Sequence, residues 1–171
     1  YHSLKEYQQA IADYDRALEL DPNYTSAYSS RGWTYYWLKE YQQAFLDFNY
    51  ALVLDPRDPY AHCRRGWAYY WLKSYQQAIN DFDHAIELDS DFSWAYCGRG
   101  CAYYDLKDYQ RAIVDFNHAL ELDPNDDWPY RLRGQTYLWL KDIKQARADY
   151  TRSWELNPSL IRNSWMIKWT D

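Results

Sequence analysis

The sequence predicts an all-α solenoid built from antiparallel helix pairs. Glycines recur at Gly32, Gly66, Gly100 and Gly134, each 34 residues after the last. Tyr, Ala and a second aromatic residue recur at fixed distances from these glycines. Self-similarity at a fixed period of roughly 20–50 residues is typical of stacked supersecondary units, so this period indicates the architecture before any single helix is assigned.

The repeat divides most of the chain into full units, numbered so that the recurring glycine is position 8. These units span residues 25–58, 59–92, 93–126 and 127–160. Residues 1–24 correspond to the second helix of an earlier unit. Residues 161–171 correspond to a partial repeat or a C-terminal capping helix. If the chain stacks end to end, Trp154, Trp165 and Trp169 near the C-terminus would belong to an interface or to that cap. Because the chain opens with Tyr, we expect it to be part of a longer protein.

Each element of a unit has a physical reason. Small residues at position 8 of the first helix and position 20 of the second allow close approach, and Ala does so without loss of helix propensity. Aromatic residues at positions 11 and 24 fill the space between the helices. The connecting turn, "LKEY" or a variant, has Lys where Gly is usual, and a positive φ there would cost about 1 kcal/mol relative to Gly. Pro at position 32 cannot continue the second helix, so a new unit begins.

These recurring residues resemble the signature of the tetratricopeptide repeat family over essentially the whole chain. The matching residues are Tyr1, Tyr35, Tyr69, Tyr103 and Tyr137 at position 11; Ala10, Ala44, Ala78, Ala112 and Ala146 at position 20; Tyr14, Phe48, Phe82, Phe116 and Tyr150 at position 24; and Pro22, Pro56, Pro124 and Pro158 at position 32, where Ser90 is the exception. The chain departs from the family at position 7, where Arg replaces the usual Leu, and at position 27, where Ser153 replaces Ala. The resemblance implies a right-handed superhelix of these 34-residue repeats, whose concave groove binds extended peptides.

Two charged positions repeat without exception. They are Arg at position 7 (Arg31, Arg65, Arg99 and Arg133) and Asp at position 23 (Asp13, Asp47, Asp81, Asp115 and Asp149). Positions that do not vary between units belong to the scaffold, so we interpret these residues as a ladder of ion pairs or hydrogen bonds between helices. An anion-binding site built from the arginines is the alternative interpretation.

The opposite side of the first helix carries the candidate binding site. On a helical wheel, positions 4, 7 and 11 face the second helix, whereas positions 2, 5, 9, 12 and 13 lie opposite, where the resemblance places the groove. Aromatic residues occupy 11 of the 20 slots at these five positions. Packing between units is the alternative explanation for such a stripe, above all for Tyr at position 12. The candidate ligand-binding residues are Trp33, Trp37, Tyr60, Cys63, Arg64, Trp67, Tyr70, Trp71, Trp94, Cys97, Trp128 and Arg131.

The groove residues also indicate the class of ligand. Some members of the family grip a C-terminal carboxylate with Lys, Arg and Asn at positions 2, 5, 6 and 9. Those slots here hold Ser29, Trp33, Arg64, Trp94 and Gly98, and because only Arg64 fits, we do not expect a carboxylate clamp. A groove of aromatic rings suits an apolar or proline-containing extended peptide, or an amphipathic helix. The rings could also hold a cation such as Arg or methyl-lysine.

Composition and motifs exclude several other functions. A net charge of -6 argues against nucleic-acid or anionic-membrane binding, and no apolar run approaches the roughly 20 residues of a membrane span. Cys63, Cys97 and Cys101 are few and odd in number, which favours a reduced, cytoplasmic protein, and no fourth ligand at standard spacing supports a metal site. No catalytic motif is present, so we expect no enzyme and no cofactor.

The main hypothesis is therefore a protein- or peptide-binding scaffold whose aromatic groove recognises an extended or helical segment. A structural module that stacks end to end is one alternative, because the ends of a solenoid expose apolar faces. A sensing or docking arm of a larger signalling or defence protein is the other. The ligand is a protein or peptide of unknown identity in each case.

Overall fold

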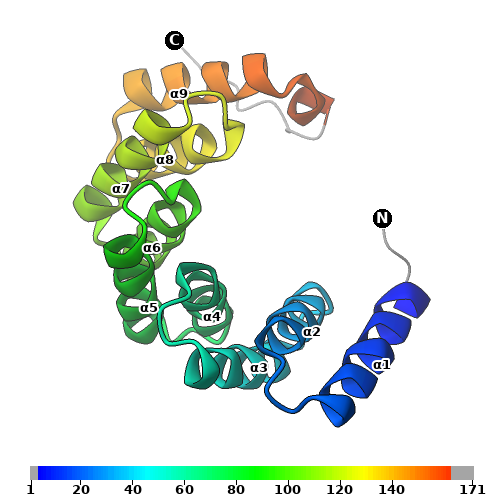
Figure 1. The fold of residues 1–171 in the computed structure, drawn as a ribbon. Helices are drawn as coiled ribbons and strands as arrows, with labels where there is room; N and C mark the ends of the chain where they lie inside the picture. The colour runs from blue at the N-terminus through cyan, green and yellow to red at the C-terminus, as the bar shows by residue number, and fades with distance from the viewer. Residues whose placement is uncertain (1–3, 163–171) are drawn as a thin grey trace.

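The structure is a computed structural model that describes residues 4–162, a range that holds helices, turns and no strand. The helices are α1 (Leu4–Leu20), α2 (Thr25–Trp37), α3 (Tyr41–Leu54), α4 (Pro59–Trp71), α5 (Tyr75–Leu88), α6 (Ser93–Asp105), α7 (Tyr109–Leu122), α8 (Asp127–Trp139) and α9 (Ile143–Leu156), followed by the 3-10 turn η1 (Pro158–Arg162). Successive helices pack against each other along a curved path (Figure 1). The prediction of an all-α solenoid is confirmed.

The first helices of the units lie on the inner side of the curve. Each of α2, α4 and α6 contacts the next first helix as well as the second helix of its own unit. Figure 1 shows α3, α5, α7 and α9 on the outer side. The surface formed by α2, α4, α6 and α8 is called the inner face below, and it carries the predicted groove residues.

Small and aromatic residues meet where the paired helices pack, as predicted for positions 8, 20 and 24. Ala44, Phe48, Ala78 and Phe82 are 0% exposed, as are their equivalents in the next unit. A Cβ atom on Gly32 would lie 2.9 Å from the Phe48 ring. A Cβ atom on the recurring glycine of α4 or α6 would lie at least as close to the position-24 ring of its own unit. Within the described residues no glycine has positive φ. Glycine is therefore required here by the closeness of the helices and not by backbone conformation.

The turn between paired helices places its lysine in the left-handed region. Lys39, Lys73, Lys107 and Lys141 have φ values of 61° to 64°. In the first of these turns the Lys39 N–H donates to the Tyr36 carbonyl at 3.0 Å and the Glu40 N–H donates to the Tyr35 carbonyl at 2.9 Å. This pair of bonds is a Schellman motif, which satisfies two free carbonyls at a helix end and normally has Gly at the left-handed position. Lysine therefore occupies a strained position in every such turn.

One glycine outside the recurring series allows an unusually close contact between units. A Cβ atom on Gly98 would lie 2.4 Å from two ring atoms of Phe82, which belongs to the preceding helix α5. The same position holds Ser30, Arg64 or Leu132 in the other units. The seam between the second and third units therefore depends on the absence of a side chain at residue 98.

The two ends of the chain extend past the described range. Trp154 is half-buried on α9 and stacks on Tyr150, with ring centroids 6.1 Å apart. Trp165 and Trp169, with most of the predicted repeat or cap over 161–171, lie outside the described residues, as does Tyr1. The assignment of 161–171 and the unit boundaries stay predictions.

We expect Gly98→Ala to lower the free energy of unfolding by about 1–3 kcal/mol, because overpacking against the buried Phe82 ring outweighs the gain in helix propensity. Gly134→Ala is the matched control, since its Cβ would meet its nearest atom, in Tyr150, at 3.2 Å. Urea denaturation followed by circular dichroism measures both. Equal shifts for the two variants would contradict the close contact at residue 98.

We expect Lys73→Gly to raise the free energy of unfolding by up to about 1 kcal/mol, because Gly adopts positive φ without the steric penalty that Lys bears. Ser74→Gly serves as the control, since Ser74 has an ordinary φ of -88° and gains nothing from glycine. The same urea titration compares the two, and a loss of stability in Lys73→Gly would show that the lysine stem contributes more than the strain removes.

Candidate functional site

Arginine–aspartate pairs join the two helices of every full unit. Arg31 donates to both carboxylate oxygens of Asp47, from Nε at 2.8 Å and from Nη2 at 2.6 Å. The same two-bond arrangement joins Arg65 to Asp81, Arg99 to Asp115 and Arg133 to Asp149. The predicted ladder between helices is confirmed. Its guanidinium groups are already engaged, which disfavours the alternative of an anion site.

Each of these arginines also reaches the second helix of the preceding unit. The Nη1 groups donate to Asp15, Asn49, Asp83 and Asn117, all at position 25. Position 25 was not among the predicted ladder residues, although Asp or Asn recurs there. The hydrogen bond to Asp47 is the largest influence on Arg31 and raises its pKa above the ordinary value, so the guanidinium stays charged. One arginine thus holds three helices in a fixed relation.

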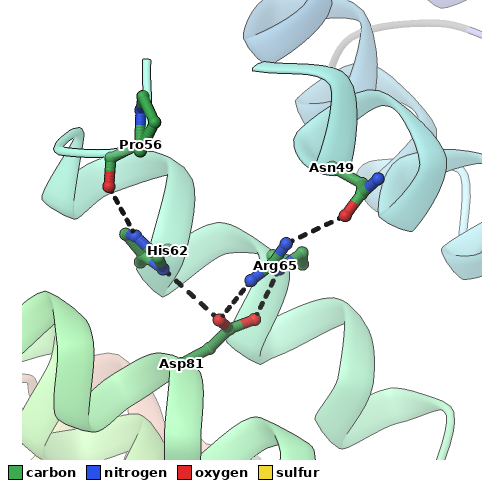
Figure 2. A network of polar contacts seen from close by, with 5 residues as sticks. All are labelled: Asn49, Pro56, His62, Arg65 and Asp81. Carbon is green, nitrogen blue, oxygen red and sulfur yellow. Dashed lines mark hydrogen bonds and ion pairs between the residues drawn. The ribbon is translucent and has the colours of Figure 1, made fainter. Parts of the chain in front are cut away.

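The second unit adds a histidine to this network, as Figure 2 shows. His62 replaces the Tyr found at position 4 of the other units. Its Nδ1 lies 3.3 Å from Asp81 Oδ1, and its Nε2 lies 3.0 Å from the Pro56 carbonyl oxygen. Both ring nitrogens thus face acceptors, an arrangement that the doubly protonated imidazolium satisfies completely. Burial lowers the pKa of His62, but the bonds to Asp81 and Pro56 outweigh it and the pKa is raised.

Four tryptophans from successive units meet on the inner face and form the tryptophan cluster, Trp33, Trp67, Trp94 and Trp128. The ring centroids of Trp67 and Trp94 are 5.6 Å apart in a stacked arrangement, and those of Trp67 and Trp128 are also 5.6 Å apart. Trp33 meets Trp94 edge to face at 5.4 Å. Position 9 of one unit therefore packs against position 2 of the following units, and this packing fills much of the predicted groove with the chain's own rings.

The tryptophan cluster corrects the predicted groove at three positions. Trp67 is 3% exposed, Cys63 0% and Cys97 1%. These side chains were expected to line an open groove, but they are buried because the rings of adjacent units close over them. Burial is also the main reason that the pKa of each thiol is raised well above its ordinary value. The two cysteines therefore behave as small apolar residues.

The other predicted groove residues retain accessible surface. Trp37 is 56% exposed, Trp71 48% and Tyr60 53%. Those that are half-buried are Trp33, Arg64, Tyr70, Trp94, Trp128 and Arg131. The Arg64 guanidinium carbon lies 5.4 Å from the Trp33 ring centroid, so this cation already makes a cation–π contact within the chain. The role of all these residues in ligand binding stays a prediction.

Tryptophans at position 13 form a second group, the edge tryptophans Trp37, Trp71 and Trp139. Trp71 stacks on Tyr41 of the preceding unit, with centroids 5.6 Å apart and ring planes 8° from parallel, and its Nε1 donates to the Tyr36 hydroxyl at 2.8 Å. Trp139 makes the same two contacts two seams further on, with Tyr109 and Tyr104 of the third unit. Tyr at position 12 therefore does contact the neighbouring unit, as its alternative interpretation held. Trp139 was not among the predicted site residues, although it shares the position of Trp37 and Trp71.

The third unit interrupts both tryptophan series and leaves a cavity. Cys101 stands at position 9 and Asp105 at position 13, where the first two units carry Trp. A cavity of about 260 Å³ opens there between α4, α6, α7 and α8. Its lining residues are Tyr70, Cys101, Tyr104, Asp105, Phe116, Leu132 and Gln135. Of these, only Tyr70 was predicted as a site residue. The departure from the repeat at positions 9 and 13 was visible in the sequence, but it identifies only Cys101 and Asp105 and not the other lining residues.

Two further classes of feature are absent from the described part of the chain. Among residues 4–162 no group of three or more His, Cys, Asp or Glu side chains is placed to hold a metal ion. None of the helices in that range is both long enough and apolar enough to cross a membrane.

Family comparisons agree with the repeat read from the sequence. The model described as tetratricopeptide repeat matches residues 59–92 and 93–126, and a second model, described as TPR repeat, matches residues 1–38. Together they account for more than half of the chain. No curated protein matches the chain in sequence.

Solved structures of similar fold include MamA (residues 41 to the end) from Desulfovibrio magneticus RS-1, with 23% identity, a TM-score of 0.80, and coverage of 90% of this chain and 87% of that one. YrrB, described as a TPR protein with an unusual peptide-binding site, has 23% identity, a TM-score of 0.72, and coverage of 92% and 81%. The first TPR of Spaghetti (RPAP3), bound to the HSP90 peptide SRMEEVD, has 26% identity, a TM-score of 0.66, and coverage of 68% and 93%.

We expect His62 to make stability depend on pH. Its pKa is raised in the folded chain, so its contribution is complete below its ordinary pKa of 6.5 and is lost as the pH rises through the folded value. His62→Tyr, the residue of the other units, removes this contribution. The free energy of unfolding of the wild type, relative to that of His62→Tyr, should therefore fall as the pH rises above 6.5 and through the raised pKa of the folded chain. His118→Gln, at an exposed outer position, is the control; parallel curves for wild type and His62→Tyr would contradict the role of His62.

Proposed function

Because the chain belongs to the tetratricopeptide repeat family, we propose that it is a non-enzymatic scaffold that binds a protein or peptide segment along its inner face. Two solved relatives support this class of partner. One is described by its peptide-binding site, and the other holds a peptide. The ligands of those proteins are their own, and the kind of contact proposed for this chain is argued from its own residues.

The edge tryptophans carry the proposal. Trp71 is held in one orientation by a stacked ring and a hydrogen bond, yet 48% of its surface remains exposed. Trp139, held in the same way, is 63% exposed, and Trp37 is 56% exposed. A ring that is already fixed loses little conformational entropy on binding, and large rigid rings are the residues that most often dominate binding energy.

The spacing of these rings favours a segment that spans several units. Trp37 and Trp71 occupy the same position in adjacent units, so their rings recur once per repeat along the inner face. Around them the inner face is rich in aromatic surface. The guanidinium of Arg64 is already engaged in a cation–π contact with Trp33. An extended peptide or an amphipathic helix with apolar residues at regular intervals suits such a surface better than a free C-terminal carboxylate does.

We expect that removing two edge tryptophans weakens peptide binding strongly. The probes are peptides selected from a random display library on the wild-type protein, with their dissociation constants measured by fluorescence anisotropy. Trp37→Ala with Trp71→Ala should weaken binding by about 30-fold or more, because a central ring contributes about 2 kcal/mol. The buried Trp67 is left intact, since its removal would disturb the tryptophan cluster.

The matched control removes apolar surface from the outer side of the solenoid. Leu46 and Val53 on α3 are 44% and 70% exposed, and Leu46→Ser with Val53→Ser should leave the dissociation constants unchanged. Circular dichroism confirms that both double variants are folded. Selected peptides that bind the tryptophan variant as well as the wild type would place recognition elsewhere.

A further inference from the structure

The cavity in the third unit exists because the repeat is broken there twice. At position 9, Trp33 and Trp67 extend into the tryptophan cluster, whereas Cys101 and Gln135 do not provide an equivalent ring. At position 13, Asp105 replaces the edge tryptophan that would stack on Tyr75 as Trp71 stacks on Tyr41. The resulting space of about 260 Å³ opens on the inner face and is large enough for one long side chain.

The walls of this cavity combine aromatic rings with a few polar groups. Tyr70 and Tyr104 come from the ends of α4 and α6, while Phe116 and Leu132 contribute apolar surface from α7 and α8. The Tyr70 hydroxyl and the Asp105 carboxylate belong to the same cavity wall. Burial is the main reason that the pKa of Tyr70 is raised, so this hydroxyl remains a donor.

Asp105 differs from the aspartates of the ladder in having no cationic partner. Asp47 and its equivalents are each bound by an arginine, but within residues 4–162 no Lys or Arg forms an ion pair with Asp105. The carboxylate is exposed, and its oxygens can accept several hydrogen bonds from an incoming group. The net charge of -6 adds a field that favours cations.

Elsewhere the same chain already binds a guanidinium with this combination of groups. The Arg111 guanidinium carbon lies 4.3 Å from the centroid of the Tyr103 ring, and its nitrogens bind the Asp108 carboxylate at 2.6 and 2.7 Å. A tyrosine face and an aspartate within reach of one another are thus a working guanidinium site in this fold. The cavity offers two tyrosines, Asp105 and the amide of Gln135 to an incoming group.

We propose that this cavity is a pocket for an arginine side chain of the bound segment. The stem would lie against Leu132 and Phe116, and the guanidinium would lie between the rings of Tyr70 and Tyr104 and bind Asp105. This inference rests on the proposed function, which it extends from a peptide in general to one with an arginine at a fixed place. Binding of arginine to the pocket is nevertheless measurable without any peptide.

The experiment uses three small probes, the N-acetyl methylamides of arginine, lysine and norleucine, and ¹⁵N NMR spectra of the whole chain. We expect saturable shifts of the Tyr104, Leu132 and Gln135 amides with the arginine probe, weaker shifts with lysine and none with norleucine. Asp105→Asn should weaken arginine binding about threefold to tenfold, as for one partly exposed charge pair. Asp105→Trp, the residue of the other units at this position, should abolish binding by filling the cavity.

Asp91→Asn is the matched control, because Asp91 is exposed in the turn before α6 and its loss changes the net charge equally. Equal binding to Asp105→Asn and wild type, equal binding of norleucine, or no shift at the pocket amides would each overturn the proposal. The peptides selected on the wild type separate this failure from failure of the proposed function. Peptides that need Trp37 and Trp71 but lack a preferred arginine would support the proposed function and overturn the proposal of an arginine pocket.

Discussion

The arginine at position 7 of each unit holds three helices at once. Arg65 binds Asp81 on the second helix of its own unit through Nε and Nη2, and Asn49 on the preceding second helix through Nη1. Partly buried ion pairs add little net stability, because desolvation offsets much of the attraction. Their planar, two-bond geometry does restrict rotation of the first helix about its axis. That restriction turns positions 2, 9 and 13 toward the inner face in every unit.

Once the first helices are oriented, tryptophans serve two different purposes. At position 9 they turn toward following units, where Trp67 stacks on Trp94 and loses almost all exposed surface. At position 13, Trp71 and Trp139 reach one unit back, and all three tryptophans of this position keep about half of their surface or more. The difference is geometric, because position 13 lies at the end of the helix, where no further turn covers the ring. Tryptophans at position 9 are therefore packed within the chain, whereas those at position 13 keep the exposed surface on which the proposed binding depends.

Departures from the repeat coincide with the local peculiarities of the structure. His62 replaces a tyrosine and introduces a proton-binding group between two acceptors. Gly98 removes a side chain and draws α6 onto Phe82. Cys101 and Asp105 together replace two rings and open the cavity. These substitutions therefore make one seam different from the next.

The sequence by itself determined the helix pairs, their order and the arginine–aspartate ladder, because each follows from a 34-residue period and from local rules of helix packing, capping and charge pairing. It also identified the face on which the tryptophans lie. Only the tertiary structure decided which of them are buried, since the packing of Trp67 against Trp94 and Trp128 depends on the curvature accumulated over three units. The cavity beside Asp105 could not be predicted from the sequence for the same reason. Its walls come from four helices, and the superhelix, not any one repeat, sets how closely those helices approach one another.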